Sequence, residues 1–228
     1  MEQLNPEHQL IPRMPLIGDV APQFYANTTS GNINFPNDFA GHWIVFFSHP
    51  SDFTPVCTTE FIAFQNKMAD FADINTTLVG LSVGANASHL AWFDAIAKMK
   101  DGVKITFPLV DDLSMGVAKK YGMIHPSASD TNAVRAVFII DPGAIIRAIL
   151  YYPPVLGRNI DEIYRAVLAL QTASAFGVAT PADWLPGEDV ITPAPVNTKQ
   201  LWKHDKQTPW FLNYKKLSKD DIYSKIRK

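Results

Sequence analysis

The order of the predicted elements is typical of an α/β domain built on a mixed β-sheet, and three observations predict it. Residues 43–47 and 76–83 are nearly continuous apolar runs, as strands covered on both faces require. Apolar residues with helical spacing follow both runs. The turn sequence Asp-Pro-Gly at 141–143 joins two extended runs, 133–140 and 144–152, which therefore form an antiparallel hairpin.

The first predicted elements lead up to a helix near residue 60. Residues 1–40, punctuated by glycines and prolines, are expected to form an irregular lead-in with short strands. After the first apolar run, Phe61, Phe64, Met68 and Phe71 recur at positions i, i+3, i+7 and i+10. This spacing predicts a helix whose first turn lies just before Phe61.

In the middle of the chain, helices and strands are expected to continue to alternate. Asn86 or Ser88 is the predicted cap of the helix that follows the second apolar run. Residues 106–110 form a shorter predicted strand, and Pro108 within it indicates a sheet edge or a strand end.

Two more helices complete the domain. Ser114 is expected to cap a short helix that runs to about Tyr121 and stops at Gly122. Asn159 or Asp161 opens the last strongly periodic helix.

The composition changes after about residue 175, where prolines and tryptophans accumulate before a basic tail. We therefore predict one domain over 10–174 and a C-terminal extension over 175–228. Trp184, Trp202 and Trp210 favour a segment packed on itself or on a partner subunit over a mobile linker with a solvated tail.

Charge and cysteine content exclude several function classes. The 228-residue chain has a formal net charge of −2, which gives no electrostatic reason to propose nucleic acid or an anionic membrane as a partner. No apolar run approaches the roughly 20 residues of a membrane-spanning helix, and no secretion signal opens the chain, so a cytoplasmic location is expected. The one cysteine excludes an intramolecular disulfide and a multi-cysteine zinc site.

That cysteine, Cys57, lies where a buried strand gives way to the first turn of a helix. Free backbone N–H groups and the helix dipole favour an anion there, and so favour the thiolate over the thiol. Thr54 adds a hydroxyl to the same loop, and Pro50 and Pro55 restrict its backbone before any substrate arrives.

Two stretches resemble one-cysteine peroxiredoxins. Pro50, Thr54 and Cys57 match the family pattern P-x-x-x-T-x-x-C inside the longer block HPSDFTPVCTTE at 49–60, and ATPADW at 179–184 resembles the C-terminal extension of that branch. The resemblance implies an α/β, thioredoxin-like fold with insertions, in which helices flank a mixed sheet, and a small C-terminal extension. It implies a thiol peroxidase for hydrogen peroxide and organic hydroperoxides, without a metal or an organic cofactor.

The resemblance also implies site residues. Cys57 is the nucleophile, and Arg135 is the cation, in agreement with the expectation that a guanidinium on an apolar strand needs an anion. Thr54 Oγ and the Cys57 backbone N–H complete a cradle for peroxide. Pro50 shields the sulfur.

Three further residues are supporting candidates with structural alternatives. Glu60 orients the arginine or is simply a capping-box acid. Arg158 matches a second family arginine or is a surface charge at a helix entry. His49 is a hydrogen-bond partner of the sulfur or a structural histidine. In the same way, Cys57 alone would suit an inert small hydrophobe, and Arg135 an ordinary surface arginine.

The predicted partners follow from the lone thiol and the family. A Cys57 sulfenic acid has no resolving cysteine in the chain, so an external small thiol or a thioredoxin-like protein is expected to reduce it. The apolar strand 145–152 predicts a homodimer that pairs edge to edge, and the resemblance adds a possible decameric ring. The alternative hypothesis for the function is a binding or chaperone-type protein in which Cys57 acts mainly as a redox sensor. A disulfide oxidoreductase is disfavoured because C-x-x-C is missing.

Overall fold

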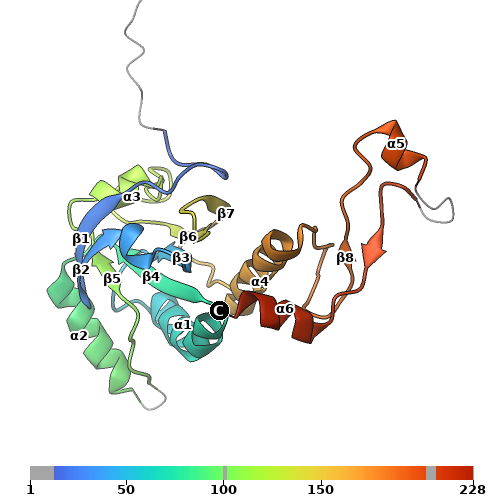
Figure 1. The fold of residues 1–228 in the computed structure, drawn as a ribbon. Coiled ribbons are helices and arrows are strands. Elements are labelled where there is room, and N and C mark those ends of the chain that lie inside the picture. Colours follow the sequence, from blue (N-terminus) through green and yellow to red (C-terminus); the bar gives the residue numbers. More distant parts are fainter. Residues whose placement is uncertain (1–12, 100–101, 204–208, 228) are drawn as a thin grey trace, which may run out of the picture. The chain divides into compact units, whose positions relative to one another are not determined.

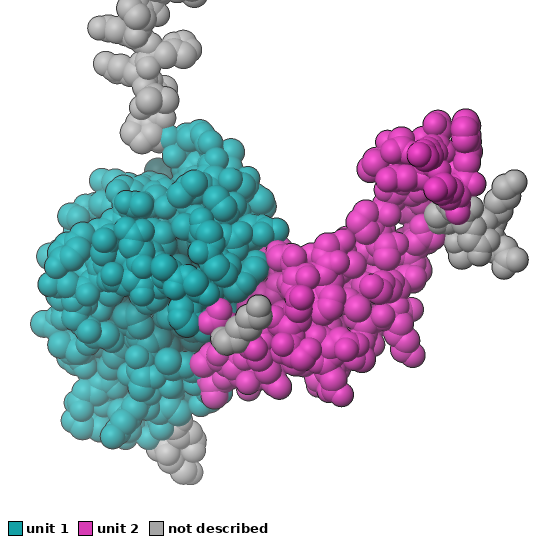
Figure 2. Space-filling view, viewed as in Figure 1, with its two compact units in different colours: residues 1–68, 76–158 teal, residues 69–75, 159–228 magenta. Residues whose placement is uncertain are grey.

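A computed structural model describes residues 13–99, 102–203 and 209–227 of the chain (Figure 1). The chain divides into two compact units, residues 1–68 with 76–158, and residues 69–75 with 159–228 (Figure 2). Within the described ranges, no helix combines the length and the apolar character that crossing a membrane requires. Every candidate site residue predicted above lies in the first unit.

The first unit is built on one seven-stranded mixed sheet in the order β2-β1-β5-β4-β3-β6-β7. Its elements are β1 (Phe24–Thr28), β2 (Gly31–Phe35), the 3-10 turn η1 (Asn37–Phe39), β3 (Trp43–Ser48), α1 (Pro55–Asp73, whose C-terminal end belongs to the second unit), β4 (Thr76–Ser82), α2 (Asn86–Ala97), β5 (Leu109–Asp111), α3 (Gly116–Lys120), β6 (Arg135–Ile140) and β7 (Ile146–Tyr152). β3, β4 and β5 run parallel, and the other neighbouring pairs are antiparallel. The predicted α/β domain with a mixed sheet is confirmed.

Consecutive phenylalanines of β3 pack on opposite faces of the sheet, because side chains alternate along a strand. Phe46 contacts Tyr121, which follows α3, with ring centroids 4.9 Å apart. Phe47 stacks on Phe64 of α1 at 4.2 Å. Since α1 and α3 cover opposite faces, β3 is buried along its whole length, as its apolar run predicts.

The strand-to-helix junction lies where the sequence places it. β3 ends at Ser48, and α1 begins at Pro55, the first helical position, where the missing proline N–H would have had no helical partner. Cys57 is the third residue of α1, and its side chain is fully buried. The prediction that the cysteine occupies the first turn is therefore confirmed.

The cap predicted for α2 is wrong. The helix begins at Asn86, and its N-cap residue is Ala85, which has no side chain that could accept a hydrogen bond. The Asn86 N–H instead donates to the carboxylate of Asp111 at the end of β5. The hydroxyl of Ser88 instead donates to Asp52 in the loop before α1. A carboxylate from another element has therefore replaced the predicted local cap.

The cap predicted for α3 is also wrong, although its replacement is local. The two oxygens of Asp112 accept hydrogen bonds from the N–H groups of Val117 and Ala118 at 3.0 and 2.7 Å, whereas Ser114 reaches only the N–H of Gly116 at 3.3 Å. The helix ends, as predicted, before a glycine at 122 with a positive φ of 65°.

The sheet topology decides two further predictions, one for Pro108 and one for the hairpin turn. Pro108 immediately precedes β5, which lies between β1 and β4, so the proline marks a strand end and not a sheet edge. The hairpin of β6 and β7 is confirmed, and Asp141 stabilises its turn by accepting from the N–H groups of Gly143 and Ile145.

The second unit contains α4 (Ile160–Phe176), β8 (Val190–Ile191), α5 (Thr198–Leu201), β9 (Tyr214–Lys215) and α6 (Lys219–Ile226). Asn159 caps α4 by accepting from the Glu162 N–H, as predicted. Trp184 is fully buried, but Trp202 and Trp210 are 79% and 49% exposed in the single chain. Trp184 is therefore buried within the single chain, where its Nε1 donates to the Glu188 carbonyl, and a partner that covers the other two stays a prediction.

Candidate active site

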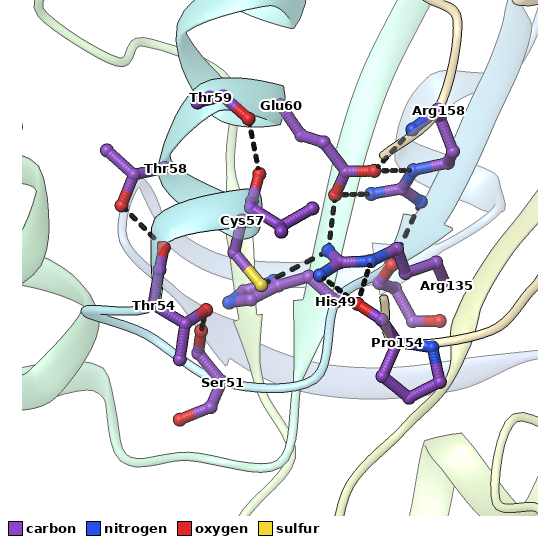
Figure 3. Close-up of polar contacts among 12 residues, drawn as sticks. His49, Ser51, Thr54, Cys57, Thr58, Thr59, Glu60, Arg135, Pro154 and Arg158 are labelled. Carbon is purple, nitrogen blue, oxygen red and sulfur yellow. Dashed lines mark hydrogen bonds and ion pairs between the residues drawn. The ribbon is translucent and has the colours of Figure 1, made fainter. Parts of the chain in front are cut away.

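The sulfur of Cys57 lies against a buried guanidinium. Nη1 of Arg135, the first residue of β6, donates to Cys57 Sγ at 3.2 Å (Figure 3). Ser48 holds this end of β6 beside β3, because its hydroxyl donates to the Val134 carbonyl and accepts from the Ala136 N–H. Arg135 is only 2% exposed, which excludes the alternative of an ordinary surface arginine.

The Arg135 guanidinium is held on its other sides as well. Its Nε and Nη2 donate to the carbonyl of Pro154 at 3.0 and 2.7 Å, and Nη1 also donates to Glu60 Oε2 at 2.6 Å. Figure 3 shows the planar group between the sulfur, the Glu60 carboxylate and the Pro154 carbonyl. These contacts fix the plane of the guanidinium, so its orientation toward the sulfur does not depend on a substrate.

Glu60 also binds a second buried arginine. Arg158 donates from Nε to Oε1 at 2.9 Å and from Nη2 to Oε2 at 2.8 Å, a bidentate pair. Its Nη1 donates to the carbonyls of Ser48 and Ala136. Burial lowers the pKa of Arg158, and the Glu60 carboxylate opposes this shift.

These contacts decide two of the alternatives left open by the sequence. Glu60 uses both oxygens to orient arginines, and Arg158 is 6% exposed, so it is not a surface charge. Two guanidiniums face one carboxylate, which leaves one positive charge in excess beside Cys57. A thiolate would balance that charge, and a buried charge is strongly unfavourable when it is unbalanced.

Thr54 and Pro50 lie in the loop between β3 and α1. The Thr54 hydroxyl donates to the Ser51 carbonyl at 2.9 Å, and the Thr54 carbonyl accepts the first helical hydrogen bond, from the Thr58 N–H. Pro50 follows the buried His49 and is itself half-buried. Both residues therefore lie on the segment that leads directly into the Cys57 turn.

His49 has a different partner from the predicted one. Its Nε2 hydrogen-bonds Asp52 Oδ1 at 3.0 Å, and its buried Nδ1 has no hydrogen-bond partner within the described part of the chain. The predicted hydrogen bond to the sulfur is therefore wrong for this structure. Burial lowers the pKa of His49, although Asp52 opposes the shift. The imidazole packs against the rings of Phe61 and Trp92, which also contact each other.

Asp52, His89 and the Pro154 carbonyl belong to the site but were not predicted. Asp52 Oδ2 accepts from His89 Nδ1 and from the Ser88 hydroxyl, both at 2.7 Å. Burial alone would raise the pKa of Asp52, but the hydrogen bonds from His49, His89 and Ser88 outweigh it and hold the pKa well below its ordinary value. The position of Asp52 inside the 49–60 block is the only signal that the sequence offered.

Comparisons with known proteins agree with this geometry. Residues 17–149 match the sequence profile of the AhpC/TSA family, and residues 169–204 match that of the C-terminal domain of 1-Cys peroxiredoxin. A peroxiredoxin of Methanosarcina mazei is 57% identical over 187 residues, covering 80% of this chain and 85% of the relative. A peroxiredoxin of Aquifex aeolicus is 49% identical over 218 residues, covering 90% and 98%.

The solved structures extend the agreement to the fold. A yeast mitochondrial 1-Cys peroxiredoxin superposes with a TM-score of 0.80 at 38% identity, covering 90% of this chain and all of that one. The predicted thioredoxin-like fold is therefore confirmed. The lone buried cysteine at a helix start, the arginine on its sulfur and these similarities together show that the chain belongs to the peroxiredoxin family of thiol-dependent peroxidases.

Proposed function

We propose that Cys57, as a thiolate, attacks one oxygen of hydrogen peroxide or of a small organic hydroperoxide. The O–O bond breaks, the sulfur becomes a sulfenic acid, and the hydroxide or alkoxide that leaves takes up a proton. The observation that carries this proposal is the 3.2 Å contact between Cys57 Sγ and Arg135 Nη1. The excess positive charge of the Arg135–Glu60–Arg158 cluster supports it, because that charge stabilises an anion at the sulfur.

The remaining predicted residues receive roles that fit their positions. Arg135 donates to the peroxide oxygens as negative charge develops on the leaving oxygen. The Thr54 hydroxyl and the Cys57 backbone N–H bind the peroxide on the other side. Pro50 shields the sulfur from solvent, and Glu60 and Arg158 act by orienting Arg135.

An external thiol completes the cycle in this proposal, because Cys57 is the only cysteine of the 228 residues. The thiol attacks the sulfenic acid, which releases water and leaves a mixed disulfide. A second thiol then displaces Cys57 and forms the free disulfide. In the yeast mitochondrial 1-Cys peroxiredoxin, the thiol resolving mechanism works via glutathione/thioredoxin systems. This similarity supports a small thiol or a thioredoxin-like protein as the reductant.

Peroxide consumption and mass spectrometry test the proposal. Wild type should consume peroxide far faster than free cysteine does, and Cys57→Ser should abolish the reaction. Peroxide-treated wild type should carry a trappable sulfenic acid on Cys57, and at high peroxide a sulfinic acid. An unmodified Cys57 after treatment would refute the mechanism.

Assembly, location and domain division are part of the same proposal. β7 is the last strand of the described sheet, which supports a homodimer, or a ring of dimers, through paired β7 edges. Light scattering on the purified chain tests this.

A thiol that needs an external thiol suits a reducing compartment such as the cytoplasm. The match over 169–204 supports an extension at 175–228 after a peroxidase domain at 10–174.

A further inference from the structure

The loop over residues 49–54 is tied to α2 through one carboxylate. The Asp52 side chain is 6% exposed, and its two oxygens meet three hydrogen-bonding groups, from His49, Ser88 and His89. An ionised carboxylate only accepts, so His49 donates from Nε2 and His89 donates from Nδ1. Ser88 and His89 lie in the first turn of α2, so the carboxylate links the loop to a separate helix.

The neighbouring loop side chains make more local contacts. The Ser51 hydroxyl donates to the Asp52 carbonyl, and the Thr54 hydroxyl donates to the Ser51 carbonyl. These bonds shape the loop internally but do not attach it to another element. The two bonds from Ser88 and His89 to Asp52 therefore carry the hydrogen-bonded attachment between this loop and α2, and the bond from His49 holds Asp52 to the start of the loop.

The residue after Asp52 has a strained backbone. Phe53 has φ = 56°, the left-handed region that a bulky L-residue rarely adopts, and its side chain is largely exposed, with 58% of the residue accessible. Packing of the ring therefore does not explain this conformation. Strain of this kind persists only where the surroundings enforce it. Asp52 is held on one side of Phe53, and Thr54 leads into α1 on the other.

We propose that Asp52 is a positioning residue for the peroxidase reaction: by joining His49, at the start of the loop, to the first turn of α2, it holds the strained turn at Phe53 and so keeps Thr54 in place beside Cys57. This inference rests on the proposed peroxide chemistry at Cys57. Asp52 itself touches neither the sulfur nor the peroxide. It acts only through the loop.

A double-mutant experiment tests the inference in the full-length protein. The second-order rate constants of Cys57 with hydrogen peroxide and with iodoacetamide are measured for wild type, Asp52→Ala, Phe53→Gly and the double variant. Iodoacetamide needs a reactive sulfur but no peroxide cradle. Asp94→Ala is the matched control, because Asp94 lies on α2 with an exposed side chain paired to Lys98. Ser88→Ala removes one of the three bonds with less risk to folding.

The expected result is selective. Asp52→Ala should slow the peroxide reaction on the order of 100-fold, as a small misplacement of a reacting group does. Alkylation should not slow, and Ser88→Ala should slow the peroxide reaction by roughly tenfold or less. Glycine relieves the strain at position 53, so Phe53→Gly should restore about tenfold of the rate lost in Asp52→Ala and change wild type little.

Three outcomes would overturn the inference. The first is an equal peroxide rate in Asp52→Ala and Asp94→Ala. The second is a loss that Phe53→Gly does not restore, since this would indicate damage to the fold and not a displaced loop. The third is an equal loss in the peroxide and alkylation reactions, which would place the defect at the sulfur. If wild type itself reacts no faster than free cysteine, the proposed function fails, and this result is separate from all three.

Discussion

Two carboxylates near Cys57 are buried to a similar extent but held by different partners. Glu60 lies between the guanidiniums of Arg135 and Arg158, and its side chain is 2% exposed. Asp52 lies between the imidazoles of His49 and His89, and its side chain is 6% exposed. Each acid therefore joins two nitrogen-bearing side chains from different parts of the first unit.

The difference lies in the charge of the partners. Arginines stay protonated at every physiological pH, so the Glu60 cluster carries an excess positive charge next to the sulfur. Burial lowers the pKa of His49, so a neutral imidazole is favoured there, and its hydrogen bond to Asp52 adds little positive charge. One cluster can stabilise an anion electrostatically. The other is suited to holding a loop.

Removing the charge of Glu60 should have the largest effect on stability. In Glu60→Gln two buried guanidiniums lose their shared counter-charge, and breaking a buried ion pair in this way destabilises a protein by about 3–5 kcal/mol. Chemical denaturation measures the free energy of unfolding. The control is Glu162→Gln, whose half-exposed pair with Arg165 should contribute no more than about 1 kcal/mol. Similar losses in both variants would contradict the charge assigned to the Glu60 cluster.

Arg135→Met should have the next largest effect, on the reaction itself. Loss of a donor to developing negative charge slows an enzyme by about 100- to 1,000-fold. Stopped-flow measurement gives the rate constant with peroxide, and thiolate absorbance against pH follows the ionisation of Cys57. Arg147→Met, in the pair with Asp141 on the hairpin, is the control and should react as wild type does. A normal thiolate titration in Arg135→Met would remove this arginine from the role of counter-ion.

The pH dependence of stability should show the smallest effect and should distinguish the two clusters. The folded-state pKa of His49 is below 6.5, so as the pH falls through 6.5 the unfolded chain takes up a proton that the folded chain does not. Stability should therefore fall between pH 7 and pH 5, by at most about 1.4 kcal/mol per pH unit for one proton. The contribution of Asp52 is retained in this window, because its folded-state pKa is below 3.8.

The measurement is the unfolding free energy at several pH values. His49→Gln cannot take up this proton, so its profile should be flatter than that of wild type. His42→Gln changes an exposed histidine and should leave the profile almost unchanged. An identical slope in wild type and His49→Gln would show that this imidazole is not a neutral buried group.

Local physics was enough to predict the element that carries the cysteine. An apolar run, a loop containing two prolines and helical spacing from Phe61 onward placed Cys57 in the first turn of α1, where the structure has it. The hairpin turn at 141–143 and the Asn159 cap were predicted for the same reason. In each case the deciding contacts join residues a few positions apart, so the sequence contains both partners side by side.

Only the tertiary structure decided which distant groups meet. The carboxylate of Asp111 receives the N–H of Asn86 at the start of α2, 25 positions away. The Pro154 carbonyl meets Arg135, and His89 meets Asp52, 37 positions away. Folding brings such partners together by burying the sheet faces, and a buried polar group then bonds to whatever donor or acceptor lies nearest in space. Sequence spacing carries no record of that proximity.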